Sequence, residues 1–161
     1  MKRNISTLLV GSMLIMSWML LGLAPAAHAA NCSTSTVAGD WAFTLIGTIL
    51  TPSGGIPAAA IPTATVDKNG IATNAKEARN VGGGYADETL TGYWTVNSDC
   101  TGTLYINAYE SGQLVRTSVV SIAFDDDSAE LRGVQKSLIL PDGTNVPVVI
   151  TLEGRKQHSN N

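Results

Sequence analysis

The sequence predicts an all-β protein, an eight-stranded antiparallel up-and-down barrel with one disulfide. After the first thirty residues no window keeps a helical period, and eight runs of strand-forming residues follow one another between turn signals. The connections are too short for the crossovers that parallel strands require, so the strands are expected to form an antiparallel meander. Closing that meander into a barrel removes both exposed sheet edges. A flat sandwich is the alternative that the pattern leaves open.

The first four strands are expected at residues 40–50, 59–66, 71–79 and 87–96. The first alternates clearly, with Trp41, Phe43, Leu45 and Ile49 on one face. Pro62 weakens the second strand and indicates an edge or a bulge, because proline lacks the N–H that a ladder needs. Residues 67–70 end in Asn-Gly, which favours a tight hairpin turn.

The last four strands are expected at residues 103–110, 114–124, 130–140 and 146–156. Short turn segments separate them at residues 111–113, 125–128 and 141–143. In the first of these strands one face carries Leu104, Ile106 and Ala108, and the other carries Tyr105, Asn107 and Tyr109. Both faces of several strands are partly apolar, so the sequence leaves the inward face ambiguous.

The N-terminus has the pattern of a secretory signal peptide. Lys2 and Arg3 precede an apolar stretch at residues 8–23, and Pro25 is followed by the small-residue segment Ala27-His28-Ala29. This predicts a signal peptide at residues 1–29, a barrel domain at 30–156 and a frayed tail at 157–161. An uncleaved anchor is the alternative, but Pro25 and the Ala-x-Ala segment favour processing. The mature protein is therefore expected to be secreted or periplasmic, with no stable membrane span.

The predicted mature chain is acidic. Loss of Lys2 and Arg3 leaves 8 of the 10 basic residues against 13 acidic ones, a net charge near −5. Nucleic acid is not an expected partner, because its binding requires Lys and Arg clusters that neutralise phosphates. About 130 residues suffice for one domain with its own core.

Cys32 and Cys100 are the two cysteines of the chain, and export carries them to an oxidising compartment. One disulfide between them is therefore expected. A zinc site is the alternative, but it would lack nearby histidines to complete its ligands.

Two segments carry a family resemblance. Cys32-Ser33 followed by Val37-Ala38-Gly39-Asp40-Trp41-Ala42-Phe43 resembles the C-S-x(n)-G-x-[YW]-x-F opening of short secreted bacterial proteins of uncharacterised function. Residues 92–103 match their motif G-x-[YW]-T-V-N-x-D-C-T-G-T. The resemblance covers nearly the whole mature chain and supports the pairing of the two cysteines. It implies an exported calycin-like or allene-oxide-cyclase-like barrel, and no known activity.

Gly39-Asp40-Trp41 is also similar to the Gly-x-Trp of lipocalins. In that family the tryptophan closes one barrel end beneath an arginine of the last strand, a place that Arg155 could take here. We interpret this match as a likeness of structural position.

The sequence offers little catalytic chemistry. His158 is the only histidine expected in the mature chain, and it lies in the tail, which argues against a Ser-His-Asp triad and a histidine metal site. Gly82-Gly83-Gly84 lacks the Lys-Ser/Thr of a phosphate loop. The acidic turn at residues 125–130 could gather calcium, but it lacks the glycine-centred spacing of a calcium loop. No cofactor is expected.

Aromatic residues on three strands, together with one cation, are the candidate ligand contacts. They are Trp41, Phe43, Tyr93, Tyr105, Tyr109 and Arg116. Each aromatic side chain has core packing as its simpler alternative.

The sequence thus favours a non-catalytic barrel that binds a small hydrophobic ligand. One alternative is an isomerase or cyclase of the allene-oxide-cyclase-like type, which needs an inward carboxylate; Glu110, Glu153 and Arg116 are the charged residues whose strands could place them inside. Another is an envelope or interaction protein that acts through loops such as residues 51–62. The pattern does not indicate the oligomeric state.

Overall fold

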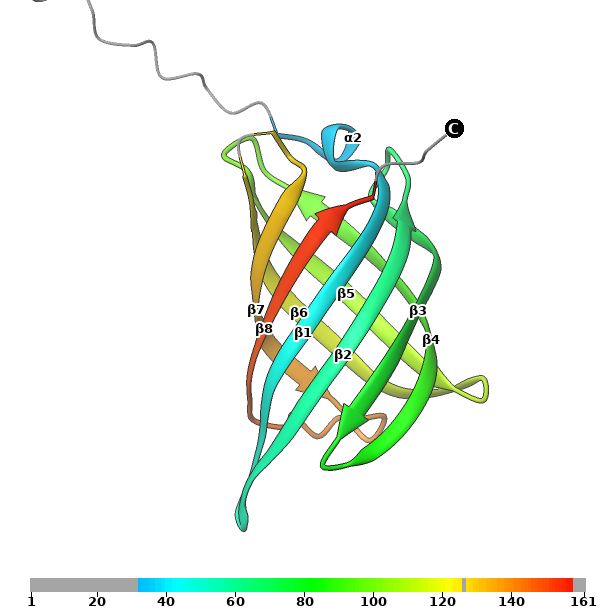
Figure 1. Ribbon diagram of the computed structural model, residues 1–161, viewed down its shortest axis with the longest axis vertical. Helices are drawn as coiled ribbons and strands as arrows, with labels where there is room; N and C mark the ends of the chain where they lie inside the picture. The colour runs from blue at the N-terminus through cyan, green and yellow to red at the C-terminus, as the bar shows by residue number, and fades with distance from the viewer. Residues whose placement is uncertain (1–31, 126, 158–161) are drawn as a thin grey trace, which may run out of the picture.

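The computed structural model describes residues 32–125 and 127–157, which form a closed barrel of eight antiparallel strands in the order β1 to β8 (Figure 1). The predicted fold class is confirmed, including the disulfide between Cys32 and Cys100. The predicted signal peptide and the tail from residue 158 onward lie outside the described residues, and His158 with them. No helix in the described part of the chain is long and apolar enough to cross a membrane.

The strands are β1 Gly39–Thr51, β2 Gly54–Val66, β3 Ile71–Val81, β4 Gly84–Val96, β5 Thr101–Glu110, β6 Gln113–Phe124, β7 Glu130–Ile139 and β8 Val148–Lys156. The sequence places every strand correctly but makes several too short. β2 begins five residues before its predicted start, because only Pro52 and Ser53 are needed to turn the chain. β4 likewise begins at Gly84, directly after the Gly82-Gly83 turn.

Pro62 lies inside the barrel wall and not at an edge, because β2 pairs with β1 on one side and with β3 on the other. The β1–β2 register runs from Ala42↔Thr63 to Leu45↔Ala60 and leaves Pro62 without a partner. The β2–β3 register shifts close by, between Thr63 and Thr65. The proline thus interrupts pairing locally, as its missing N–H requires, without ending the sheet.

The two ends of the barrel differ in construction (Figure 1). The disulfide end carries a short helix, α2 Thr34–Val37, together with the β2–β3, β4–β5 and β6–β7 turns. The hairpin end, as we call the opposite one, carries the β1–β2, β3–β4 and β5–β6 turns and the β7–β8 loop. Along each strand, side chains alternate between the inside and the outside of the barrel. An inward side chain therefore lies nearer to one end or to the other, depending on its place in the strand.

Large aromatic side chains fill the interior at the disulfide end. Trp41, Phe43, Trp94 and Phe124 pack together with ring centroids 5.4–6.0 Å apart. Trp41 is only 1% exposed, and its indole N–H donates to the carbonyl oxygen of Val37 at 2.9 Å. The aromatic cluster and α2 therefore close this end of the barrel.

Lys156, not Arg155, lies against Trp41. Lys156 is paired with Trp41 across β1 and β8, its Nζ lies 6.0 Å from the ring centroid, and it donates to the carbonyl oxygen of Thr36 at 3.0 Å. Arg155 is the next residue along the strand, so it points outward and pairs with Glu130. The position suggested for Arg155 by the lipocalin-like motif is thus wrong by one residue.

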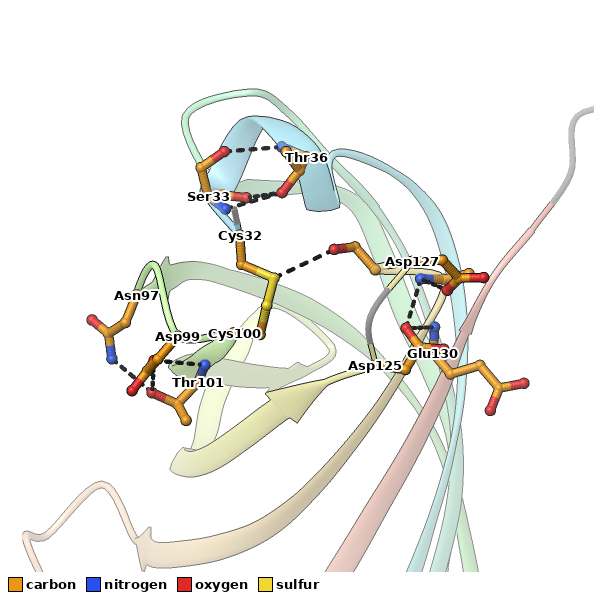
Figure 2. The surroundings of a disulfide bond; sticks show 12 residues. Cys32, Ser33, Thr36, Asn97, Asp99, Cys100, Thr101, Asp125, Asp127 and Glu130 are labelled. Carbon is orange, nitrogen blue, oxygen red and sulfur yellow. Dashed lines mark hydrogen bonds between the residues drawn. A yellow bond between two sulfur atoms is a disulfide. The ribbon is translucent and has the colours of Figure 1, made fainter. Parts of the chain in front are cut away.

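The disulfide joins the N-terminal segment before α2 to the β4–β5 turn (Figure 2). Both cysteines are buried, and Ser128 from the β6–β7 turn lies 3.5 Å from the sulfur of Cys32. The α2 turn is capped by Ser33, whose Oγ accepts from the N–H of Thr36. A helix of four residues is too short to leave a periodic signal, which is why the sequence pattern missed it.

Candidate functional site

An internal cavity of about 90 Å³ lies between the aromatic cluster and the hairpin end. Phe43 and Trp94 form its floor, and most of its wall is apolar. Small side chains leave the space open, above all the alanines of β2 and β3: Ala58, Ala60, Ala64, Ala72 and Ala75. The cavity is therefore a consequence of the small side chains that β2 and β3 turn toward the interior.

Four charged residues meet inside the barrel near the hairpin end. They are Glu77 and Arg79 on β3, Glu88 on β4 and Arg116 on β6, and all but Glu88 line the cavity. We call them the charged cluster. The side chains of Glu77 and Glu88 are 3% and 0% exposed, whereas those of Arg79 and Arg116 are 25% and 15% exposed. The two guanidinium groups thus lie between the buried carboxyl groups and solvent.

Hydrogen bonds connect the charged cluster across three strands. Arg116 donates from one terminal nitrogen to Glu77 and from the other to Glu88. Arg79 donates from Nε to the second oxygen of Glu88 at 2.6 Å. Both oxygens of the buried Glu88 carboxylate are therefore satisfied by cations, as burial of a charge requires.

The two-residue turn at Gly82-Gly83 sets this geometry. It pairs Val81 with Gly84, and the same register places Glu77 directly opposite Glu88. Both glycines have positive φ, 57° and 92°, which glycine adopts without the steric cost of a side chain. A tight turn of this kind fixes which side chains face each other, and here it brings two carboxyl groups together.

Glu77 holds a proton more tightly than an ordinary carboxyl group. Burial, together with a hydrogen bond to Glu88, raises its pKa from 4.5 to about 7 against the lowering effect of Arg116. Glu77 therefore changes its protonation state near neutral pH, inside the cavity.

Glu88 behaves in the opposite way. Burial by itself raises its pKa, but the hydrogen bond with Glu77 and the two guanidinium groups outweigh burial and lower the pKa overall. The pair therefore divides into an ionised Glu88 and a Glu77 that carries the proton, and the two titrate as one coupled unit.

A neutral polar pair lies beside the charged cluster. Gln135 of β7 donates from Nε2 to Ser118 Oγ at 3.0 Å and to the carbonyl oxygen of Ser137 at 3.1 Å, and both Gln135 and Ser118 line the cavity. The cavity thus has an apolar body and one polar side that offers charged and neutral hydrogen-bonding groups.

The sequence-predicted ligand residues separate into those that point into the barrel and those that lie on its outward face. Phe43 and Arg116 line the cavity, while Trp41 belongs to the aromatic cluster beneath it. Tyr93 and Tyr105 stack on each other outside the barrel, with ring centroids 4.5 Å apart. Tyr105 reaches the cavity through its backbone, since its carbonyl oxygen lies close to the inward Gly92. Tyr109 shares the outward face of β5 with Tyr105.

Two of the charged residues that the sequence suggested could point into the barrel lie on its outside. Glu110 and Glu153 are both exposed, Glu110 at the end of β5 and Glu153 on the outward face of β8, where Leu152 and Gly154 occupy the inward positions. Arg116 alone of the three proposed charges points inward. The strand alternation that places Leu152 inside necessarily places Glu153 outside.

Sequence reasoning missed Glu77, Arg79 and Glu88. The inward position of Glu88 could have been predicted, because strand alternation places its side chain on the same face of β4 as Trp94, a residue expected in the core. The phase of β3 was ambiguous, since Lys76, Ala78 and Asn80 alternate with Glu77 and Arg79 and neither set is apolar. Only the pairing with β4 determines which set faces inward.

Two carboxylates of the acidic β6–β7 turn, those of Asp125 and Asp127, bind backbone N–H groups of the same turn (Figure 2). Asp125 accepts the backbone N–H groups of Ala129 and Glu130 at 3.0 Å, and Asp127 accepts that of Ala129 at 2.9 Å. These contacts account for Asp125 and Asp127 as turn-forming groups. In the described part of the chain no three His, Cys, Asp or Glu side chains gather as a metal site would require.

Comparison of the chain with protein-family models, curated proteins and solved structures finds no significant match.

Proposed function

We propose that this protein is an exported binding barrel that holds a small ligand in its internal cavity. The observation that carries the proposal is an apolar cavity with one polar side, formed by Glu77, Arg79, Arg116, Ser118 and Gln135. Convergent polar groups in an otherwise apolar pocket are the usual composition of a small-molecule site.

The cavity volume limits what the barrel can enclose. A volume of about 90 Å³ is smaller than a cavity of about 150 Å³ that holds benzene. The enclosed part of the ligand therefore has only a few non-hydrogen atoms. A longer ligand would extend toward the hairpin end, where the two arginines are partly exposed.

A matched pair of variants tests this proposal. Ala75→Val on the inward face of β3 fills part of the cavity, whereas Ala78→Val on the outward face of the same strand does not. Thermal unfolding is measured with a panel of four-carbon acids, amides, alcohols and amines. We expect at least one compound to stabilise the wild type and Ala78→Val, and to lose its effect on Ala75→Val. Binding that survives in Ala75→Val would place the ligand elsewhere, and a panel without any binder would reject the proposal.

A second candidate function is supported by Glu77 alone. A carboxyl group with a pKa of about 7 in a water-restricted cavity suits general acid–base chemistry, such as an isomerisation or cyclisation that moves a proton. Exchange of deuterium from solvent into the α-carbon of 2-butanone, followed by NMR, tests it. Faster exchange than in buffer, lost in Glu77→Gln, would favour the enzyme; equal rates would favour the binding barrel.

A further inference from the structure

The charge balance of the cavity is unequal at neutral pH and below. Among the described residues the lining contains three charged side chains, Glu77, Arg79 and Arg116, with Glu88 directly behind them. While Glu77 carries its proton, the two guanidinium groups face a single carboxylate, that of Glu88. One positive charge is then left without a counter-charge in a partly buried place, where charge is poorly solvated.

Arg79 has the unused hydrogen-bond donors of this cluster. Arg116 uses both of its terminal nitrogens, one on each glutamate. Arg79 uses only Nε, and its two terminal nitrogens have no hydrogen-bond partner within residues 32–125 and 127–157. Its side chain lines the cavity and is 25% exposed. The terminal edge of a guanidinium group binds the two oxygens of a carboxylate in a planar, bidentate geometry.

We infer that the ligand of this barrel is a small carboxylate with a short apolar tail, whose carboxylate binds the terminal nitrogens of Arg79 while the tail lies against the alanines of β2 and β3. This inference rests on the proposed binding function and specifies its ligand class. The 90 Å³ cavity limits the enclosed tail to a few carbon atoms.

Other charge types fit the cavity less well. An amine would meet the two guanidinium groups, and both carboxyl groups are already hydrogen-bonded to Arg116. A neutral amide or alcohol would occupy the same space but leave the excess positive charge of the charged cluster without a counter-charge. Like-charge contact and loss of solvation both disfavour these ligands relative to a carboxylate.

Four compounds of nearly equal size test the inference on the wild type: butyrate, butyramide, 1-butanol and butylamine. Their dissociation constants are measured by isothermal titration calorimetry at pH 6, where Glu77 is protonated. We expect butyrate to bind at least tenfold more tightly than butyramide, and butylamine to be the weakest. Equal affinities for butyrate and butyramide, or a preference for butylamine, would overturn the inference and leave the binding function intact. If none of the four binds, the binding function itself fails.

A pair of arginine variants locates the carboxylate. Arg79→Gln removes the free donors from the cavity, and Arg132→Gln makes the same change at an exposed position of β7. We expect the preference for butyrate over butyramide to disappear in Arg79→Gln and to persist in Arg132→Gln. Arg79→Lys, which keeps the charge but not the planar donor edge, should retain part of the preference. A preference that is undiminished in both Arg79 variants would overturn the inference, and circular dichroism verifies that the variants fold.

Discussion

Glu77 and Glu88 face each other as directly paired residues of β3 and β4, and Arg116 donates to both carboxyl groups from β6. The pair is buried, yet only Glu88 has both of its oxygens bound by guanidinium groups. This asymmetry separates their acidities, so that one proton remains on Glu77 near neutral pH. Coupling of this kind makes both the stability and the chemistry of the cavity depend on pH.

Stability should decrease as the pH rises from 4.5 to 7. The pKa of Glu77 is about 7 in the folded protein against 4.5 normally, so over this range the folded state binds more protons than the unfolded chain. The stabilisation that the folded state gains from the proton on Glu77 is complete below pH 4.5 and lost above pH 7, with an upper limit of roughly 3 kcal/mol. Groups facing Glu77 are Arg116, Glu88 and Arg79, and β2 contributes no ionisable residue. Urea unfolding at a series of pH values measures how the free energy of unfolding changes with pH.

Glu77→Gln should remove this pH dependence of the free energy of unfolding, whereas Glu153→Gln at an exposed position of β8 should retain it. The lowered pKa values of Glu88, Asp99 and Asp142 act in the opposite sense and only below about pH 4.5, so they do not obscure the effect. A wild-type stability that is constant between pH 5 and 8 would contradict the assignment of the proton to Glu77.

Replacing Arg116 by methionine should destabilise the barrel strongly. The change leaves two buried glutamates with Arg79 as the remaining cation, and removal of one partner from a buried ion pair costs about 3–5 kcal/mol. Protonation of Glu77 relieves part of this penalty, so the lower end of that range is expected at pH 6.

The matched control for Arg116→Met is Arg155→Met. Arg155 also pairs with a glutamate, Glu130, but the two side chains are 76% and 44% exposed. Exposed ion pairs contribute about 1 kcal/mol or less. Urea unfolding compares the two variants, and similar losses of unfolding free energy would show that the charged cluster has no special role in stability.

Removing the disulfide should reduce the free energy of unfolding by about 4 kcal/mol. Cys32 and Cys100 are 68 residues apart, and a loop of that length greatly restricts the unfolded chain. The double variant Cys32→Ser/Cys100→Ser is compared with the wild type by urea unfolding, with and without reductant. Reductant should destabilise the wild type and leave the double variant unchanged. A loss below 1 kcal/mol would indicate that loop closure contributes little here.

Gly154→Ala should destabilise the floor of the cavity. A Cβ at this inward position of β8 would lie 2.5 Å from the Phe43 ring, and overpacking of this kind costs about 1–3 kcal/mol. Gly84→Ala is the control, because the nearest atom to its Cβ would be the carbonyl oxygen of Val81 at 3.4 Å. Urea unfolding should show a loss for the first variant and little change for the second. A neutral Gly154→Ala would mean that Phe43 moves freely.

Much of the fold could be predicted from local sequence. Asn69-Gly70 and Gly82-Gly83 end strands because glycine allows the required backbone angles. The alternation from Trp41 to Ile49 groups these residues on one face of β1, and the structure shows that this face is the inward one. The site was predicted only in part. Phe43 and Arg116 line the cavity, but Glu110 and Glu153 are outside, and the residues that define the polar side were missed.

The sequence by itself determined the strand count, the meander connectivity and the two cysteines available to form a disulfide. These features depend on residues near one another in the chain, or on composition. Only the tertiary structure decided that Glu77, Glu88 and Arg116 meet, because β6 reaches β3 and β4 only across the interior of the closed barrel. The charge and the acidity of the cavity arise from that meeting, since burial and opposed charges shift a pKa only where the groups lie together.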